Sequence, residues 1–289
     1  MLPVWAAPFP CRRLGPNRSM NRIRRITVLG LFLAAGLAGC GRETYLERFD
    51  ETKRYFAYED KLNQYLTRVA WAGKSFQIRV PKQFQPIATK IAKKGEEEAD
   101  EKDPRQPKFA ELEFAGLQGA WQASFPLTGG AGSGEGYLYL CSNYDLLAKK
   151  GDEERAKAFN ADVILRCATA FGQQASTKRL SELPLFDIPP KAEEAFVEKR
   201  KFHVLSPGIP ALVNDKPYRV RIFSYKKEKS SAQISLVYIL PDNIVQASVL
   251  DKAIDLSVET LVVTQDKPPA ATPKGAKGGK GKAPGAGAL

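Results

Sequence analysis

Residues 216–241, KPYRVRIFSYKKEKSSAQISLVYILP, decide the fold class of this 289-residue chain. Residues 216–227 and 232–241 are rich in β-branched and aromatic side chains, and the polar stretch EKSS lies between them. Two such runs with a short polar connection predict a β-hairpin, because turn residues at the end of one strand return the chain beside it. We therefore expect an antiparallel sheet.

Helical patterns flank this hairpin. Residues 243–263 place Leu250, Ile254, Val258 and Leu261 at helical spacing. Residues 151–172 have acids in the first turn of an expected helix, and Gly172 lies beyond its end. Residues 75–84, SFQIRVPKQF, alternate apolar and polar as a half-buried strand does. Together these patterns predict an α+β domain over residues 73–265, preceded by a membrane-proximal helical segment over residues 40–72.

The helical segment carries two aromatic stripes. Tyr45, Phe49 and Phe56 share one side, and a wider stripe is formed by Tyr58, Leu62, Tyr65, Leu66 and Val69. The stripes could lie in a lipid interface, where tyrosine is favoured. Packing on the protein's own domain is the interpretation we prefer.

Three stretches resemble a known fold class. The strand FQIRVP at residues 76–81, the hairpin and the helix VLDKAIDLSVETL at residues 249–261 resemble the Mog1/PsbP class of αβα sandwiches. That resemblance implies an antiparallel sheet with helices on both faces, in a class that includes binding and assembly factors. Residues 40–66 also resemble uncharacterised lipoproteins of planctomycete-type bacteria.

The chain begins with an expected targeting segment. Residues 26–39 contain no charged side chain, and Arg22, Arg24 and Arg25 precede them. A basic patch followed by a short apolar run and small residues is typical of a secretory signal peptide. The run is shorter than the ~20 residues that a membrane-spanning helix needs. We expect residues 1–39 to be removed and Met20 to be the true start.

The end of that segment, Leu37-Ala38-Gly39-Cys40, resembles the lipobox of bacterial lipoproteins. The resemblance implies that the Cys40 thiol receives a diacylglycerol group and that its amine is acylated after cleavage. Several acyl chains on one residue hold a protein stably in a membrane. The alternative is an ordinary signal peptide with a chance cysteine at its cleavage point.

The basic excess lies at the two ends of the chain. The formal charge is +12, but residues 40–265 have 33 basic and 31 acidic side chains. The body of the chain is therefore nearly neutral, which argues against a nucleic-acid partner. The tail 266–289, with five lysines and one acid, has the composition of a disordered segment, as does the charged surface loop near residues 90–108. The tail either touches anionic lipid or cell-wall polymer, or only keeps the protein soluble.

No catalytic, metal-binding or cofactor-binding set stands out. The chain has a single histidine, His203, with Ser206 nearby but no G-x-S-x-G motif, and it has no C-x-x-C pair. The glycine-rich residues 129–136 fit no nucleotide-binding motif and predict a loop between two strands. Cys141 and Cys167 form either one disulfide or two separate buried thiols.

The densest basic group in the folded part lies on the hairpin, at Arg219, Arg221, Lys226, Lys227 and Lys229. One interpretation is a ligand-contact patch. The other, which we prefer, is an edge strand that basic side chains protect against pairing with other chains.

These observations predict a lipid-anchored extracytoplasmic protein of the cell envelope that binds a ligand or assists envelope assembly. Its expected partners are membrane lipid, through Cys40, and an anionic envelope polymer or envelope proteins. A hydrolase of envelope polymers and a membrane-tethered scaffold for protein partners are the alternatives.

Overall fold

The structure is a computed structural model that describes residues 42–89, 103–108, 112–130, 132–171, 183–189, 196, 198–206, 211–213 and 216–265. Its helices are α2 (Arg42–Tyr65), α3 (Tyr144–Leu147), α4 (Glu153–Ala170) and α5 (Ala247–Glu259), with a 3-10 turn η1 (Thr128–Gly130). Its strands are β1 (Trp71–Ala72), β2 (Phe76–Ile78), β3 (Gln85–Pro86), β4 (Leu117–Pro126), β5 (Ser133–Ser142), β6 (Leu185–Ile188), β7 (Arg200–Leu205), β8 (Ala211–Val213), β9 (Lys216–Lys226), β10 (Gln233–Pro241) and β11 (Val262–Val263).

The chain divides between Phe56 and Ala57 into two compact units, so that α2 contributes to both. The first unit contains the described residues of α2 up to Phe56. The second contains the end of α2 and both sheets.

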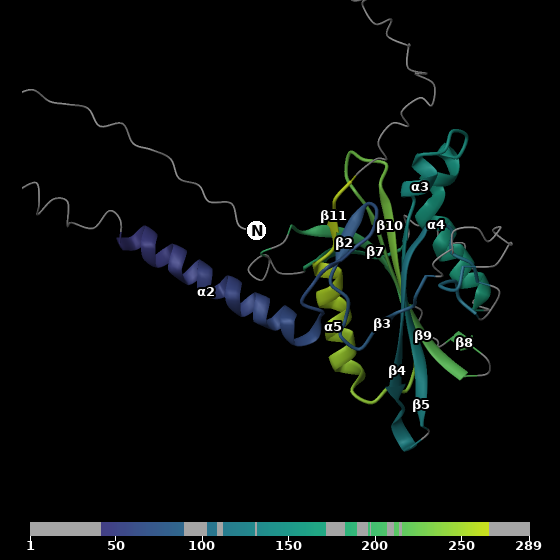
Figure 1. Cartoon of the computed structure of the whole chain (residues 1–289), viewed down its shortest axis with the longest axis horizontal. Coiled ribbons are helices and arrows are strands. Elements are labelled where there is room, and N and C mark those ends of the chain that lie inside the picture. Colours follow the sequence, from purple (N-terminus) through teal and green to yellow (C-terminus); the bar gives the residue numbers. More distant parts are fainter. Residues whose placement is uncertain are drawn as a thin grey trace, which may run out of the picture. The chain divides into compact units, whose positions relative to one another are not determined.

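The larger sheet has the order β3-β4-β5-β10-β9-β7-β6, with β8 also paired to β9. All of its pairs are antiparallel, and β9 and β10 form the expected hairpin, in register from Lys226 opposite Gln233 to Tyr218 opposite Pro241. Figure 1 shows β4, β5, β9 and β10 side by side, with α4 and α5 beside them. A small second sheet has the order β1-β2-β11.

The central strands contribute to two separate hydrophobic clusters. Successive side chains of a strand point to opposite sides, so neighbours such as Ile222 and Phe223 fall in different clusters. The cluster with Phe223 includes Leu250, Ile254 and Val258 of α5. The cluster with Ile222 includes Phe159, Val163 and Cys167 of α4. Strand β10 supplies both clusters and is buried along its whole length.

A buried arginine joins three elements of the second unit. The Arg79 side chain donates from Nε to the Thr67 carbonyl, from Nη1 to Glu59 at 3.1 Å and from Nη2 to Asn63 at 2.6 Å. Its carbonyl accepts a hydrogen bond from the Ser257 hydroxyl on α5 at 2.6 Å. These contacts fix the end of α2 beside β2 and α5.

Several sequence predictions are confirmed. The chain is α+β with a mostly antiparallel sheet and an N-terminal helix, and helices α4 and α5 lie where periodicity predicted them. Of the glycine-rich residues, Gly129, Gly130 and Gly132 lie between β4 and β5 and have positive φ angles, whereas Gly134 and Gly136, expected in the loop, lie in β5. In the second aromatic stripe Tyr58, Leu62 and Leu66 are buried together with Leu256, while Val69 is exposed.

The first stripe lies in the first unit. Tyr45, Phe49 and Phe56 expose 67, 45 and 61% of their surface. The expected signal peptide (1–39), the lipobox with Cys40, the tail (266–289) and residues 90–102 of the charged loop lie outside the described residues.

Candidate functional site

The basic group on the hairpin separates into two parts in the structure. Arg219 and Arg221 lie along β9 and face α5, whereas Lys226, Lys227 and Lys229 lie at the turn before β10. The edge-strand interpretation is wrong, because β9 has β10 on one side and β7 and β8 on the other. The short strand β6 occupies that edge of the sheet instead.

Two carboxylates of α5 pair with the arginines of β9. Asp251 lies 3.3 Å from Nη1 of Arg219 and 3.4 Å from Nη1 of Arg221, and Asp255 lies 2.9 Å from Nη2 of Arg221. Residues four apart share a helix face, so both acids point to the same strand. The side chains are between one fifth and about half exposed, so each pair contributes only about 0.2–1 kcal/mol after solvent screening.

Arg219 is held less completely than Arg221. Its Nε and Nη2 atoms are buried and make no hydrogen bond in the described part of the structure, although the Asp242 carboxylate lies 4.0 Å from Nε. Arg221 makes a further contact, because its guanidinium lies 5.0 Å from the centre of the Phe223 ring. A cation over an aromatic face at this distance is attracted by the ring.

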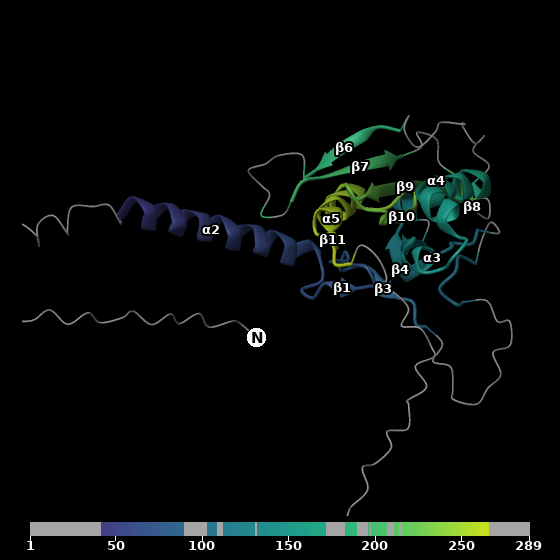
Figure 2. The ribbon, with the colours of Figure 1, turned by 90° about the horizontal axis from the view of Figure 1, so that it is seen from above.

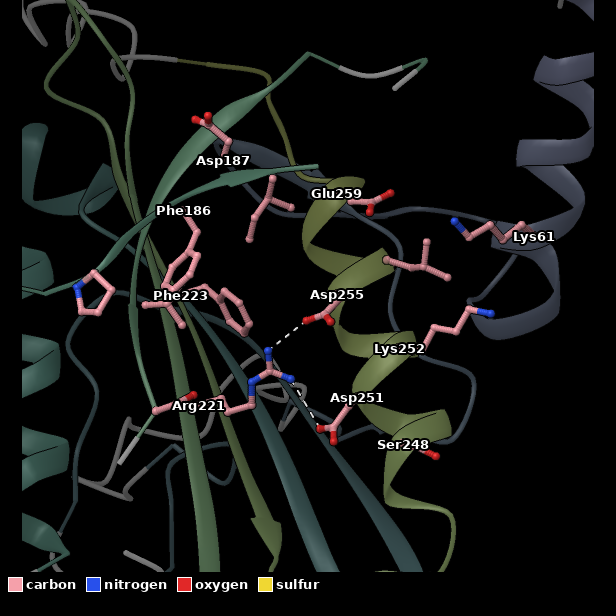
Figure 3. A pocket seen from close by; sticks show the side chains of 15 residues that line it. Lys61, Phe186, Asp187, Arg221, Phe223, Ser248, Asp251, Lys252, Asp255 and Glu259 are labelled. Carbon is pink, nitrogen blue, oxygen red and sulfur yellow. Dashed lines mark hydrogen bonds and ion pairs between the residues drawn. The ribbon is translucent and has the colours of Figure 1, made fainter. Parts of the chain in front are cut away.

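A cavity of about 870 Å³ opens beside these ion pairs, between α5 and strands β6, β7 and β9. Its apolar lining consists of Pro184, Phe186, Ile188, Val204, Phe223 and Leu256. Figure 3 shows the Phe186 and Phe223 rings close together, with Arg221 between them and the carboxylates of α5. Ligand cavities of proteins measure about 300–1,000 Å³ and are mostly apolar with a few polar groups. This cavity fits that description.

Strand β6 forms one wall of the cavity and exposes apolar surface there. It pairs with β7 from Leu185 opposite His203 to Ile188 opposite Arg200. Figure 2 shows β6 and β7 side by side over α5. Phe186 is 51% exposed, which leaves about half of its ring for contact with another molecule.

Charged groups surround the other end of the cavity. Lys61 of α2 and Lys252 and Glu259 of α5 line it (Figure 3). Glu259 is 6% exposed and accepts a hydrogen bond of 3.2 Å from the Tyr58 hydroxyl. Burial, followed by the neighbouring Glu259 charge, raises the pKa of Tyr58 well above its ordinary value. Lys252 lies 4.8 Å from the centre of the Tyr65 ring.

The lysines of the hairpin turn line a second hollow, of about 690 Å³. Lys226 and Lys229 face Lys157 and Glu153 of α4 across it. Lys157 is exposed and pairs with Glu154 at 2.6 Å. Most residues that line this hollow are polar or charged, and the structure does not bring its lysines together with Arg219 and Arg221.

Cys141 and Cys167 are both free thiols, buried in the cluster between β5 and α4. The structure therefore contains the second of the two alternatives, separate buried thiols, rather than a disulfide. Burial raises the pKa of both thiols well above the usual range.

His203 lies in β7, opposite Leu185 and Ser224. Its Nδ1 atom is buried and has no hydrogen-bond partner among the described residues. Within the same residues, no group of three or more His, Cys, Asp or Glu side chains could hold a metal ion. None of the described helices is both long and apolar enough to span a bilayer.

Comparison of the chain with models of protein families and with curated proteins gives no match.

Sequence reasoning found Arg221 but missed the side chains that make its surroundings a cavity. Phe186 and Ile188 lie in a short strand within a proline-rich stretch, and Asp251 and Asp255 look like ordinary surface acids of an amphipathic helix. Their spacing of four residues is the one signal that both acids share a helix face.

Proposed function

We propose that this chain is a lipid-anchored extracytoplasmic binding protein whose ligand site is the cavity between α5 and strands β6, β7 and β9. The proposal is supported by the lining of this cavity, which combines apolar side chains with charged groups at its ends. One of the apolar side chains, Phe186, is half exposed. Such a site suits an amphiphile. Its apolar part would contact Phe186 and Phe223, and its polar group would lie near Lys61, Lys252 and the acids of α5.

The ion pairs of Arg221 give this site a defined wall. Asp251 and Asp255 pair with its guanidinium, so Arg221 is a fixed part of the cavity wall. A role in envelope assembly is consistent with such a site if the ligand is a component of the envelope.

We infer further that the domain is an αβα sandwich of the class that its sequence resembles. The two hydrophobic clusters support this inference, since one contains the apolar residues of α5 and the other those of α4. Fold alone transfers no function, so the binding proposal depends on the cavity.

The cavity is tested with the apolar fluorescent probe N-phenyl-1-naphthylamine. Phe186→Ser removes half-exposed apolar surface at small cost in stability, and we expect probe affinity to fall about fivefold, since this ring contact is worth about 1 kcal/mol. Leu212→Ser is the matched control, because Leu212 is 64% exposed on β8 and does not line the cavity. Equal affinities for the original chain and Phe186→Ser, or equal losses in both variants, would contradict the proposal.

The anchor is tested by the intact mass of the protein purified from native membranes, beside a Cys40→Ala form. A mature chain that begins at Cys40 and carries added acyl mass supports the anchor. A mass without lipid would show that the localisation is wrong, whatever the cavity binds.

A further inference from the structure

The first half of α2 presents an exposed aromatic face. Tyr45, Phe49 and Phe56 are 67, 45 and 61% exposed, and Leu46 beside them is 47% exposed. The Tyr45 and Phe49 rings stack with their centres 6.3 Å apart. Large apolar side chains gathered on one helix face indicate that the face contacts something.

The charges of this segment are sorted around the helix. At 100° per residue the acids Glu43, Glu47, Asp50 and Glu51 lie on the side away from the aromatic face. Lys53 lies beside that face, with its Nζ atom 4.2 Å from the centre of the Phe49 ring and 4.0 Å from the Asp50 carboxylate. The aromatic face therefore has a lysine at its border, and the acids lie behind it together with Arg54.

We infer that this aromatic face lies in the headgroup region of an anionic membrane, with Lys53 directed to the lipid headgroups. An interfacial helix buries its apolar face a few ångströms into the boundary between headgroups and acyl chains. Tyrosine is favoured at that depth, and a lysine beside an apolar face extends its amine toward the headgroups.

The proposed lipid anchor at Cys40 is the reason to infer that the aromatic face contacts a membrane. This inference rests on the proposed anchor at Cys40, which is five residues before Tyr45. Five residues span at most about 18 Å when fully extended. A lipid on Cys40 would therefore hold Tyr45 within reach of the same bilayer.

A second copy of the chain is a poorer match for this face. A coiled-coil seam needs apolar residues repeated at alternate spacings of three and four over several heptads. Between Phe49 and Phe56 that seam would contain Thr52, whose hydroxyl donates to the Arg48 carbonyl on its own helix. The aromatic face is also only about three helical turns long.

The test uses the acylated full chain in vesicles of phosphatidylethanolamine and phosphatidylglycerol. A nitroxide is attached at Phe49→Cys, on the aromatic face, or at Glu51→Cys, the matched control on the acidic side. Collision rates with oxygen, which concentrates in lipid, and with a water-soluble nickel complex are then measured by electron paramagnetic resonance. The chain without either substitution gives the background, because Cys141 and Cys167 are buried.

We expect the oxygen-to-nickel ratio to be several-fold higher at position 49 than at position 51. Equal ratios at the two positions in an acylated, vesicle-bound chain would overturn this inference and leave the anchor intact. Shielding of position 49 from both reagents would also overturn it, in favour of a protein partner or a second copy. A chain without acyl mass would overturn the anchor itself and, with it, the tether used here.

Discussion

Asp251 is the residue whose replacement most directly tests the wall of the cavity. Its carboxylate accepts from Arg219 at 3.3 Å and from Arg221 at 3.4 Å. Asp251→Asn keeps the shape of the side chain and removes its charge. Arg221 retains Asp255 at 2.9 Å, but Arg219 then keeps only Asp242, at 4.0 Å.

The magnitude follows from exposure and from the number of pairs. Side chains that are 22 to 34% exposed are screened by solvent, so each lost pair is worth about 0.2–1 kcal/mol. Two lost pairs and the uncompensated repulsion between the arginines together predict a loss of about 1–2 kcal/mol in the free energy of unfolding. Salt near 1 M should reduce that loss, since the Debye length falls to about 3 Å.

The assay is urea unfolding followed by circular dichroism, with Asp162→Asn as the control. Asp162 makes one exposed pair, 2.7 Å from Nε of Arg166 on the same helix, and its loss should cost about 0.3–0.5 kcal/mol. A loss for Asp251→Asn no larger than that of the control would refute the reasoning. So would an effect that salt leaves unchanged.

Three further predictions concern the rest of the domain. Arg79→Met should lower the free energy of unfolding by about 3 kcal/mol, because α2 loses two side-chain hydrogen bonds, at Glu59 and Asn63, and the Thr67 carbonyl loses a third. Urea unfolding beside the exposed-site variant Arg166→Met measures the difference. Burial raises the pKa of Tyr238 in the folded state. Its contribution to stability is therefore complete below the pKa of the unfolded state, near 10, and is lost as the pH rises above that value. Thermal unfolding between pH 8 and pH 11 should show this decline, and a melting temperature that rises over this range would contradict it. Cys141 and Cys167 should react with a thiol reagent only when the domain opens, since burial raises the pKa of both thiols; rapid labelling without urea would show that the cluster around α4 is not closed.

Much of the architecture follows from local patterns. Helices α4 and α5 repeat their apolar residues with the helical period of 3.6. In the hairpin, β9 alternates apolar and polar residues from Tyr218 to Ile222, and β10 is a nearly continuous apolar run, which is typical of a fully buried strand. Such patterns are visible over 10 to 20 residues and need no knowledge of distant contacts. The likeness of Leu37-Ala38-Gly39-Cys40 to a lipobox is local in the same sense.

The candidate site is different, because its residues come from separate parts of the chain. Phe186 and Phe223 line the same cavity because β6 pairs with β7 and β7 pairs with β9. The position of β9 inside the sheet also follows from those pairings, which is why its arginines do not protect an edge of the sheet.

The sequence by itself determined which segments are strands and helices, and where charge and apolar residues gather along the chain. The tertiary structure alone decided that Asp251 and Asp255 neutralise the arginines of β9 and that α5 closes a cavity against β6 and β7. The reason is physical. A period records which face of an element is apolar, but many packings can bury the same face, and the choice among them depends on contacts between residues far apart in the chain.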